Sequence, residues 1–376
     1  MAAEITDPHD AWNAFVNGLR SAGDRVADDT VRLGSTQRAD AFRALLRGLN
    51  NQLGRFEVDR ERPELVAFNG WREKMLMDNP DFRYWVADIR DDRRYRITGS
   101  IGDAAYQSVT VYSASGRLDA TATARTDSDS MSFDDDGSFE LTVSRDRPAD
   151  GSDWLPLAEG SSVVWVRQFH HDATHDQLGR CRIEPLDDPP PSPPIDFDRF
   201  NRHLARLGTT MDAIPAMWRA ATRDDLASPN SVRRWQEMAG GAAFTEPGIH
   251  YLRGSWDLED DEALVLEGFA PESRYWNVLL YSRTLNSLDH RSRTVSWTSA
   301  VPGETAGAYR FVISSTDPGA GERAAGAPAD EGSAGVHWLD TEGRRFGLFV
   351  FRFLHPTIEP ELPAIRRCRV ADVGSE

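Results

Sequence analysis

Three histidines and an aspartate, His170, His171, Asp172 and His175, stand within six residues of one another. Zinc and copper accept imidazole and carboxylate ligands, so this cluster could bind such a metal and serve a metalloenzyme. The cluster follows an apolar stretch with strand character, which places it in a loop. The alternative is a polar loop whose histidines face water, because metal sites usually draw their ligands from separated elements. Apart from this metal, no cofactor is predicted.

A second group of polar residues stands in the C-terminal part of the chain. Asp289 and His290 are adjacent and could act as general base and acid, although neighbours on a strand point to opposite faces. His337 and Asp340 flank Trp338 and could take part in the same chemistry. We therefore predict Asp289, His290, His337 and Asp340 as catalytic residues of a hydrolysis or an elimination.

Further residues in the same region could bind the ligand, because tryptophan rings stack against the CH faces of sugars. The predicted ligand-binding residues are Trp256, Trp276, Arg291, Arg352 and His355. The competing interpretation assigns the tryptophans to a β-sandwich core, where most tryptophans of such folds lie.

The elements that must position these groups form a module that occurs twice in the sequence. The matched segments alternate apolar and polar residues and are rich in Val, Tyr, Phe and Thr, which is the pattern of half-buried strands. Each copy is therefore expected to be a sandwich or a jelly roll. The matches pair 95–100 with 251–255, 106–113 with 275–282, 139–144 with 309–314, 154–160 with 338–343, 166–170 with 351–355, and 180–183 with 367–370.

The second copy is longer than the first and is predicted to carry insertions. One is 256–273, interpreted as an added hairpin, and another is the Gly- and Ala-rich loop 319–335. Cys181 and Cys368 fall at equivalent places in the two copies. We expect them to be free, mostly buried thiols that lie too far apart for a disulfide, rather than a catalytic thiol.

Comparison of the copies also separates architectural from functional candidates. Arg167 and Arg352 are equivalent, and an arginine present in both copies favours a structural role. His337 and Asp340 have no equivalents in the first copy, which makes them better candidates for a site grafted onto the fold.

Helical segments are predicted before each module. Apolar residues at helical spacing occur at 11–19 and 39–53 and continue through 71–77 and 82–86, while the Pro-rich stretch 186–196 predicts a stiff linker. The expected fold class is mainly β with helical additions (α+β), with two tandem jelly-roll-like sandwiches related by internal duplication. The expected order is a helical segment at 1–90, the first module at 91–185, the linker at 186–196, a helical segment at 197–245 and the second module at 246–373.

Four segments of the second module stand out together with Arg352 and Pro356: Leu252-Arg-Gly-Ser-Trp256, Tyr275-Trp-Asn-Val-Leu-Leu-Tyr281, Asp317-Pro-Gly319 and Trp338-Leu-Asp-Thr-Glu-Gly343. In these residues the second module resembles the domain-of-unknown-function family 1214. The first half is more loosely similar to family 1254, which often precedes 1214. The resemblance implies tandem jelly-roll-like sandwiches with helical additions and no general activity. The sequence departs from the family where His337 stands in place of the expected Asn and where the loop 319–335 is longer.

Composition narrows the function further. The formal net charge of −17 disfavours nucleic acid and anionic membranes as partners. No apolar run could span a bilayer and no secretory signal opens the chain, so a cytoplasmic location is expected. Lys74 is the single lysine among many arginines, which indicates a GC-rich genome such as that of an actinobacterium and leaves one residue for Schiff-base chemistry. Serine-hydrolase, P-loop and dinucleotide motifs are missing from the sequence.

These observations favour a cytoplasmic protein that handles a small molecule or a carbohydrate. If it is an enzyme, we expect an acid–base hydrolase or lyase with its site in the second module or in the groove between the modules. A non-catalytic binding or assembly module, for example a homo-oligomer, is the first alternative. A metalloenzyme that uses residues 170–175 is the second.

Overall fold

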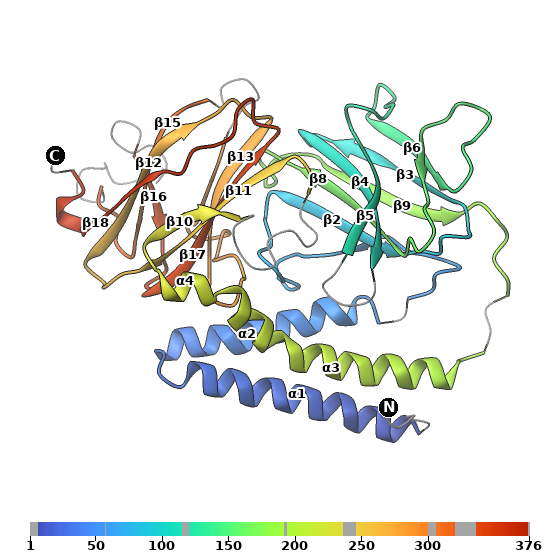
Figure 1. The fold of residues 1–376 in the computed structure, drawn as a ribbon, viewed down its shortest axis with the longest axis horizontal. Coiled ribbons are helices and arrows are strands. Elements are labelled where there is room, and N and C mark those ends of the chain that lie inside the picture. The colour runs from blue at the N-terminus through green and yellow to red at the C-terminus, as the bar shows by residue number, and fades with distance from the viewer. Residues whose placement is uncertain are drawn as a thin grey trace. The chain divides into compact units, whose positions relative to one another are not determined.

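The computed structural model describes residues 7–56, 58–114, 120–191, 194–235, 246–299, 306–319 and 336–374. The fold is mainly β with helical additions, and the described chain divides into two compact units, each with one β-sandwich (Figure 1). The first unit comprises Met1–Met75, Phe82–Gln168 and Gln177–Ala220. The second comprises Leu76–Asp81, Phe169–Asp176 and Ala221–Glu376. Two short segments from the first half of the sequence thus belong to the second unit.

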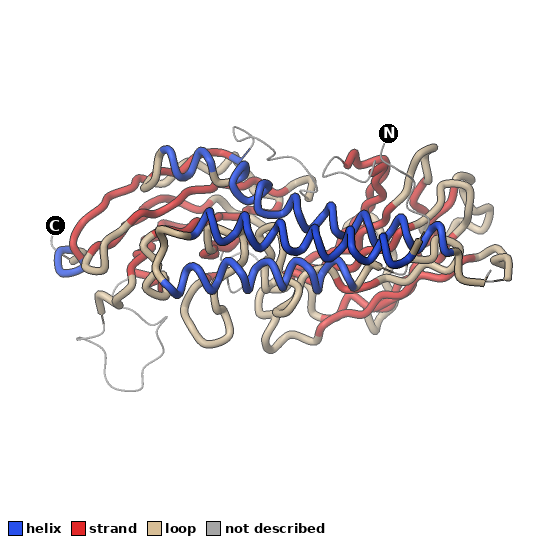
Figure 2. Tube along the Cα trace, turned by 90° about the horizontal axis from the view of Figure 1, so that it is seen from below, coloured by secondary structure: helices blue, strands red, loops and turns tan. Residues whose placement is uncertain are grey.

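Long helices form one part of the first unit: α1 (Pro8–Thr30), α2 (Ser35–Leu53) and α3 (Phe197–Ala221). The side chain of Asp7 caps α1 by accepting a hydrogen bond from His9 N, and Pro8 starts the helix where a missing N–H is harmless. The helices lie side by side (Figure 2). Contact between α1 and α3 depends on two glycines, since a Cβ added to Gly18 would lie 2.2 Å from the carbonyl oxygen of Gly208.

The sandwich of the first unit consists of two sheets with the strand orders β1-β2-β8-β4-β5 and β7-β6-β3-β9. Valines of β4 and β8 pack against Ile97 of β3 and Leu141 of β6 in one continuous core. The strands are β1 (Val66–Ala67), β2 (Phe82–Asp88), β3 (Tyr95–Gly102), β4 (Tyr106–Ala114), β5 (Ala120–Asp127), β6 (Ser138–Ser144), β7 (Trp154–Pro156), β8 (Val163–Phe169) and β9 (Leu178–Pro185).

The sandwich of the second unit has the sheet orders β10-β11-β17-β13-β14 and β16-β15-β12-β18. Aromatic rings fill its core; Trp276, for example, stacks on Phe353 with ring centroids 5.5 Å apart. Its elements are α4 (Arg223–Ala227), β10 (Ser231–Arg234), β11 (Ile249–Asp257), β12 (Glu262–Ala270), β13 (Tyr275–Tyr281), β14 (Ser296–Thr298), β15 (Gly307–Ser314), β16 (Val336–Asp340), β17 (Phe346–Leu354), β18 (Ala364–Arg369) and the 3-10 turn η3 (Val370–Asp372).

The strand orders of the two sandwiches correspond one to one, from β1 with β10 to β9 with β18. Even the parallel pairing recurs, between β6 and β7 in one unit and between β15 and β16 in the other. The architecture of two tandem sandwich modules expected from the sequence is therefore present. Five of the six sequence matches join corresponding strands.

The first sequence match, of 95–100 with 251–255, is wrong, because β3 corresponds to β12 and β11 corresponds to β2. The segment 256–273 is consequently no inserted hairpin, since it contains β12, the counterpart of β3. The segment 82–86 is likewise not helical, and its place is in β2. Its run of Phe, Tyr, Trp and Val favours a strand over a helix. Helix is also absent from 71–77, and β10 lies in the stretch 197–245 that was expected to be helical. The predicted loop 319–335 lies almost wholly outside the described residues.

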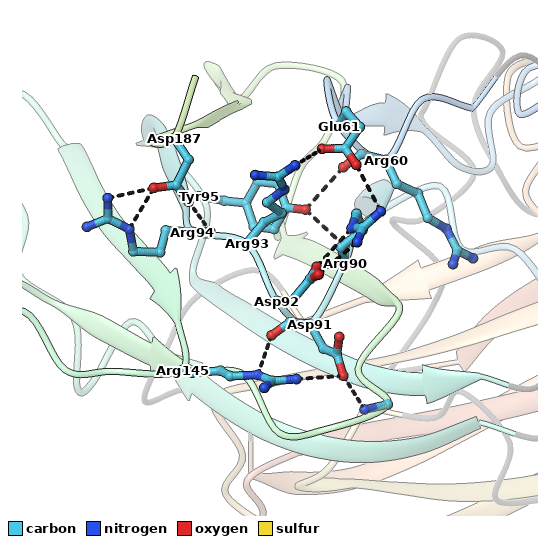
Figure 3. A network of polar contacts seen from close by, with 11 residues as sticks. Arg60, Glu61, Arg90, Asp91, Asp92, Arg93, Arg94, Tyr95, Arg145 and Asp187 are labelled. Atoms are coloured by element: carbon cyan, nitrogen blue, oxygen red, sulfur yellow. Dashed lines mark hydrogen bonds and ion pairs between the residues drawn. The ribbon is translucent and has the colours of Figure 1, made fainter. Parts of the chain in front are cut away.

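A network of charged side chains fixes the turn between β2 and β3 (Figure 3). Tyr95 stands at its centre, accepting a hydrogen bond from Arg90 N and donating one to Arg60 O. Burial raises the pKa of Tyr95 to about 12, so the hydroxyl keeps its proton. The ion pairs around it are mostly exposed and each contributes little stability. These pairs are Arg90–Glu61, Arg90–Asp92, Arg93–Glu61, Arg94–Asp187 and Arg145–Asp91.

Candidate functional site

A polar cluster lies on the face of the β10-β11-β17-β13-β14 sheet that is turned away from the aromatic core. Side chains alternate along β13, so Trp276 points into the core while Tyr275 and Asn277 point to the other face. Asn277 pairs in register with Arg352 on β17 and with Thr298 on β14. The strand order and this register therefore place four polar side chains together.

The segment Leu76–Asp81 packs on this face and is bonded to it at several points. Met77 N donates to Leu285 O at 2.8 Å. The carboxylate of Asp78 accepts hydrogen bonds from Ser287 N at 2.9 Å and from Ser287 Oγ at 2.7 Å. The Tyr281 hydroxyl donates to Asp78 O at 3.0 Å. These bonds fix the backbone that carries Asp81.

Asp81 is the centre of the cluster, and its Oδ2 atom receives all of its side-chain hydrogen bonds. Tyr275 Oη donates at 2.7 Å, Thr298 Oγ1 at 2.6 Å and Asn277 Nδ2 at 3.3 Å. Within the described ranges, Oδ1 accepts no hydrogen bond, and Asp81 is partly exposed. Asp81 thus has one oxygen held by the protein and one oxygen that accepts no hydrogen bond from the described residues. We call Asn79, Asp81, Tyr275, Asn277 and Thr298 the Asp81 cluster.

Asn79 completes the hydrogen bonding within the Asp81 cluster. Its Nδ2 donates to Tyr275 Oη at 3.2 Å, and its Oδ1 accepts from Asn277 Nδ2 at 3.3 Å and from Asp81 N at 3.1 Å. The tyrosine hydroxyl therefore accepts one bond and donates one, and its proton points to Asp81.

Burial raises the pKa of Asp81 above its usual range, while hydrogen bonds from Thr298, Tyr275 and Asn277 and the charge of Arg352 lower it without cancelling the effect. The pKa of Tyr275 is raised well above its ordinary value by burial and by the neighbouring Asp81. The shared proton therefore stays on the tyrosine. An Asp with a raised pKa and one open oxygen is suited to accept and return a proton.

The predicted histidine cluster lies beside Asp81, but its three rings have separate partners. His171 Nδ1 lies 2.6 Å from Ser299 O, so it must carry the proton and leave the lone pair on Nε2. The His171 ring is 5.8 Å from that of Tyr275. His170 is buried, with Nδ1 3.0 Å from Asp176 Oδ2.

His175 is exposed and pairs with Asp172 at 2.7 Å. Across the part of the chain that the structure describes, no three His, Cys, Asp or Glu side chains are grouped as a metal site requires. The geometry of residues 170–175 thus fits hydrogen bonding in a loop better than metal coordination.

The structure brings two of the four predicted catalytic residues, Asp289 and Asp340, into one network with Glu342. Glu342 Oε1 accepts a hydrogen bond from Asp289 N, and Glu342 N donates to Asp340 Oδ1 at 2.7 Å. Asp340 is buried and its Oδ2 pairs with Arg293 at 2.7 Å. The Asp289 carboxylate accepts from Arg291 N and from a serine in the same turn.

Different contacts surround the other two predicted catalytic residues. The ring of His337 packs 5.2 Å from Trp297 and 5.4 Å from Phe311, at the margin of the aromatic core. His290 is half-buried in the turn after Asp289. The arrangement around Asp340 is that of an ion pair that stabilises two loops.

The predicted ligand-binding residues are also dispersed. Trp256 and Trp276 are buried in the core, which leaves no ring face for a sugar. Arg291 is exposed, and His355 follows β17 with a positive φ of 47°. Arg352 alone among them borders the Asp81 cluster, where its Nη2 donates to Met77 O at 3.1 Å.

Sequence reasoning missed Asp81 and the polar residues of β13. Tyr275 and Asn277 alternate with apolar residues on a strand, which is the available sign that one face of this sheet is polar. Asp81 corresponds to Gly248, because the carbonyl before β2 accepts a bond from His170 N and the carbonyl before β11 accepts one from His355 N, each at 2.9 Å. The carboxylate is thus present in one copy only.

The remaining predicted nucleophiles have ordinary structural surroundings. Cys181 on β9 and Cys368 on β18 are free and partly buried, which confirms two free thiols at corresponding strands. Burial raises the pKa of Cys181 to about 12, so a thiolate is disfavoured. Lys74 is buried with Nζ 4.4 Å from the centre of the Trp71 ring.

Comparison with known protein families gives one match. Residues 87–172 match the family described as protein of unknown function DUF1214. The resemblance to DUF1214 is thereby confirmed, but for the first module and not for the second, whose segments suggested it. The looser resemblance to family 1254 stays a prediction.

One solved structure supports the fold. A crystal structure of an uncharacterised protein from Burkholderia cenocepacia superimposes with a TM-score of 0.84 at 23% identity, covering 96% of this chain and 98% of that chain. The VPA0106 protein from Vibrio parahaemolyticus has a TM-score of 0.46 at 10% identity, with 94% and 100% covered. No curated protein matches the sequence. Among the described helices, none is long and apolar enough to cross a membrane.

Proposed function

We propose that this protein is a cytoplasmic acid–base enzyme, a hydrolase or a lyase, that acts on a small polar molecule or a carbohydrate at the Asp81 cluster. The single observation that carries the proposal is the geometry of the Asp81 carboxylate. Its Oδ2 is held by three neutral donors, while Oδ1 is left open on a partly exposed residue. Asp81 and the side chains that hold it belong to the second unit, although Asp81 itself lies outside the module 246–373 in which the sequence predicts the site.

Asp81 would take a proton from the substrate through Oδ1. Tyr275 and Thr298 would keep the carboxylate oriented, because their hydroxyls hold Oδ2 at 2.7 and 2.6 Å. The elevated pKa matches this role, since a proton acceptor works best when its pKa is not far below the working pH. Removing water on substrate binding would raise the proton affinity of Asp81 further.

His171 is the second proton-transferring group of the proposal. The bond of Nδ1 to Ser299 O fixes the tautomer, and the ring stands next to that of Tyr275. An elimination or a hydrolysis needs a base and an acid on different sides of the reacting bond. Asp81, bonded to the Tyr275 hydroxyl, and His171, whose ring lies 5.8 Å from that of Tyr275, supply two groups of different chemistry.

A conversion screen tests the proposal. Purified protein is incubated with pools of small polar compounds and sugar derivatives, and their loss is followed by mass spectrometry. The variants are Asp81→Asn and, as a control of the same chemistry, Asp260→Asn at an exposed position. We expect a compound that wild type and the control convert equally and that Asp81→Asn converts at least about 100-fold more slowly. Full activity of Asp81→Asn on every converted compound would contradict the proposal.

A further inference from the structure

The backbone leading to Asp81 is in an unusual conformation. Leu76 and Met77 have φ angles of 55° and 61°, so two consecutive non-glycine residues are left-handed. Side chains with a Cβ rarely adopt this conformation, and it persists only where the surroundings impose it. Strain of this kind tends to occur beside functional groups.

Two buried side chains donate hydrogen bonds to the backbone of the strained turn. Arg352, with 4% of its surface exposed, donates from Nη2 to Met77 O at 3.1 Å. Tyr281, fully buried, donates to the next carbonyl, Asp78 O, at 3.0 Å. The Arg352 guanidinium lies 5.6 Å from the centre of the Tyr281 ring, which keeps both groups in one place. Two successive carbonyls are therefore held by one Arg–Tyr pair.

The first module contains the same pair of residue types. Arg167 on β8 and Tyr112 on β4 occupy the corresponding positions, and Arg167 Nη2 donates to Tyr112 Oη at 3.0 Å. Its guanidinium lies over the rings of Tyr112 and Trp165. In the second module the pair donates to Met77 O and Asp78 O, which belong to the segment that carries Asp81.

We propose that Arg352 and Tyr281 are positioning residues that hold the strained turn at Leu76 and Met77 and thereby aim the open oxygen of Asp81 at the substrate. This inference rests on the proposed function of Asp81. It replaces the predicted role of Arg352 as a ligand-binding residue, because the Arg352 side chain is buried and directed to the backbone. Neither residue touches the reacting atoms in this scheme.

The main test uses Tyr281→Phe, which deletes one hydroxyl and keeps the ring. The matched control is Tyr112→Phe, the same change at the corresponding position of the first module. Amide hydrogen exchange of Met77, whose N–H is bonded to Leu285 O, reports on the turn. We expect exchange about fivefold to tenfold faster in Tyr281→Phe, the factor that one net hydrogen bond provides, and no change in Tyr112→Phe.

A second readout follows Asp81 itself. Carbon NMR of aspartate-labelled protein, with the signal assigned by its loss in Asp81→Asn, gives the pH at which Asp81 titrates. Arg352→Met should move this titration to higher pH because the charge of Arg352 lowers the pKa of Asp81. With a substrate in hand, Tyr281→Phe should lower kcat and leave KM nearly unchanged.

The outcomes separate the two proposals. Faster exchange in Tyr281→Phe together with full activity of Asp81→Asn would show that the pair holds the turn, and would reject the enzymatic role that this positioning is proposed to serve. Unchanged Met77 exchange in Tyr281→Phe would reject the positioning role even if Asp81→Asn is inactive. An equal effect of Tyr112→Phe on Met77 would also reject it, because a general loss of packing would then explain the result. Tyr281→Phe decides the question if Arg352→Met fails to fold.

Discussion

Replacing Asp81 by asparagine should make the protein more stable at neutral pH, the opposite of what deletion of a hydrogen-bonded side chain usually does. Asparagine has the same shape, and its carbonyl oxygen can accept the bonds from Tyr275, Thr298 and Asn277 that Oδ2 now accepts. The amide nitrogen would take the place of the open Oδ1. The substitution thus keeps the network and removes a charge from a poorly solvated site.

The sign of the effect follows from the raised pKa of Asp81. The folded protein binds the proton at a higher pH than the unfolded chain does. The contribution of Asp81 to stability is therefore fully present below the unfolded pKa of 3.8 and is lost as pH rises through the folded pKa. Asp81→Asn has no such loss, so the two proteins should differ most at neutral pH.

The size of the gain follows from the size of the pKa elevation. Each unit of elevation is worth about 1.4 kcal/mol in the free energy of unfolding. Hydrogen bonds to a neutral amide are weaker than those to a carboxylate by about 1 kcal/mol each. The variant no longer has the cost of burying a charged carboxylate, which is on the order of several kcal/mol. The raised pKa shows that desolvation exceeds the bonds, and the expected gain is on the order of 1 kcal/mol per unit of elevation.

Urea denaturation between about pH 3.5 and pH 8 measures the difference. The stability curve of wild type should fall relative to that of Asp81→Asn as pH rises, and then run parallel to it. Parallel curves over the whole range would show that Asp81 titrates as in the unfolded chain. A variant less stable than wild type at neutral pH would show that the bonds to the carboxylate dominate. Either result would refute the reasoning from desolvation.

Three further substitutions test the architecture. Asp225→Asn should lower the free energy of unfolding by about 3–5 kcal/mol, because it leaves the nearly buried Arg253 guanidinium without its counter-charge. Gly18→Ala should lower the free energy of unfolding by about 1–3 kcal/mol through the clash with Gly208 O. Gly23 lies in the same helix, and a Cβ added there would be 4.0 Å from the ring of Phe42, so Gly23→Ala should raise the free energy of unfolding by about 0.5–1 kcal/mol. Urea denaturation measures all three, and equal effects of the two alanines would contradict the predicted contact between α1 and α3.

The sequence predicted strands best where one face is buried and the other is polar. Alternation along 106–113 and 139–144 predicts β4 and β6 because the period of a strand is two residues. In the segment that became β2, apolar residues at 82, 85 and 86 also fit helical spacing, and spacing alone cannot separate the two structures. The error then shifted the repeat, since β11 was matched with β3. Very short edge strands such as β1 and β10 have no period to detect.

The candidate site was only partly predictable for a different reason. His171 and Arg352 were singled out by residue type, and both border the Asp81 cluster. Asp81 was not, because its hydrogen bond to Tyr275 joins residues 194 positions apart, and no local pattern encodes that contact. The rule that favours residues present in one copy alone would have found Asp81 against Gly248 had the strands been matched correctly.

The two modules show how such a site can arise from a structural pair. In the first module, Tyr106 Oη donates to Asp127 at 3.0 Å, and Arg125 pairs with the same carboxylate at 3.0 Å. Thr298 stands in the second module where Asp127 stands in the first, and the carboxylate comes instead from Asp81 on a separate segment. An acid already paired with a guanidinium is committed to that ion pair, whereas one held by neutral donors keeps an oxygen for a substrate. Exchanging a strand carboxylate for a loop carboxylate thus leaves the sheet intact and gives the second module a group that can transfer protons.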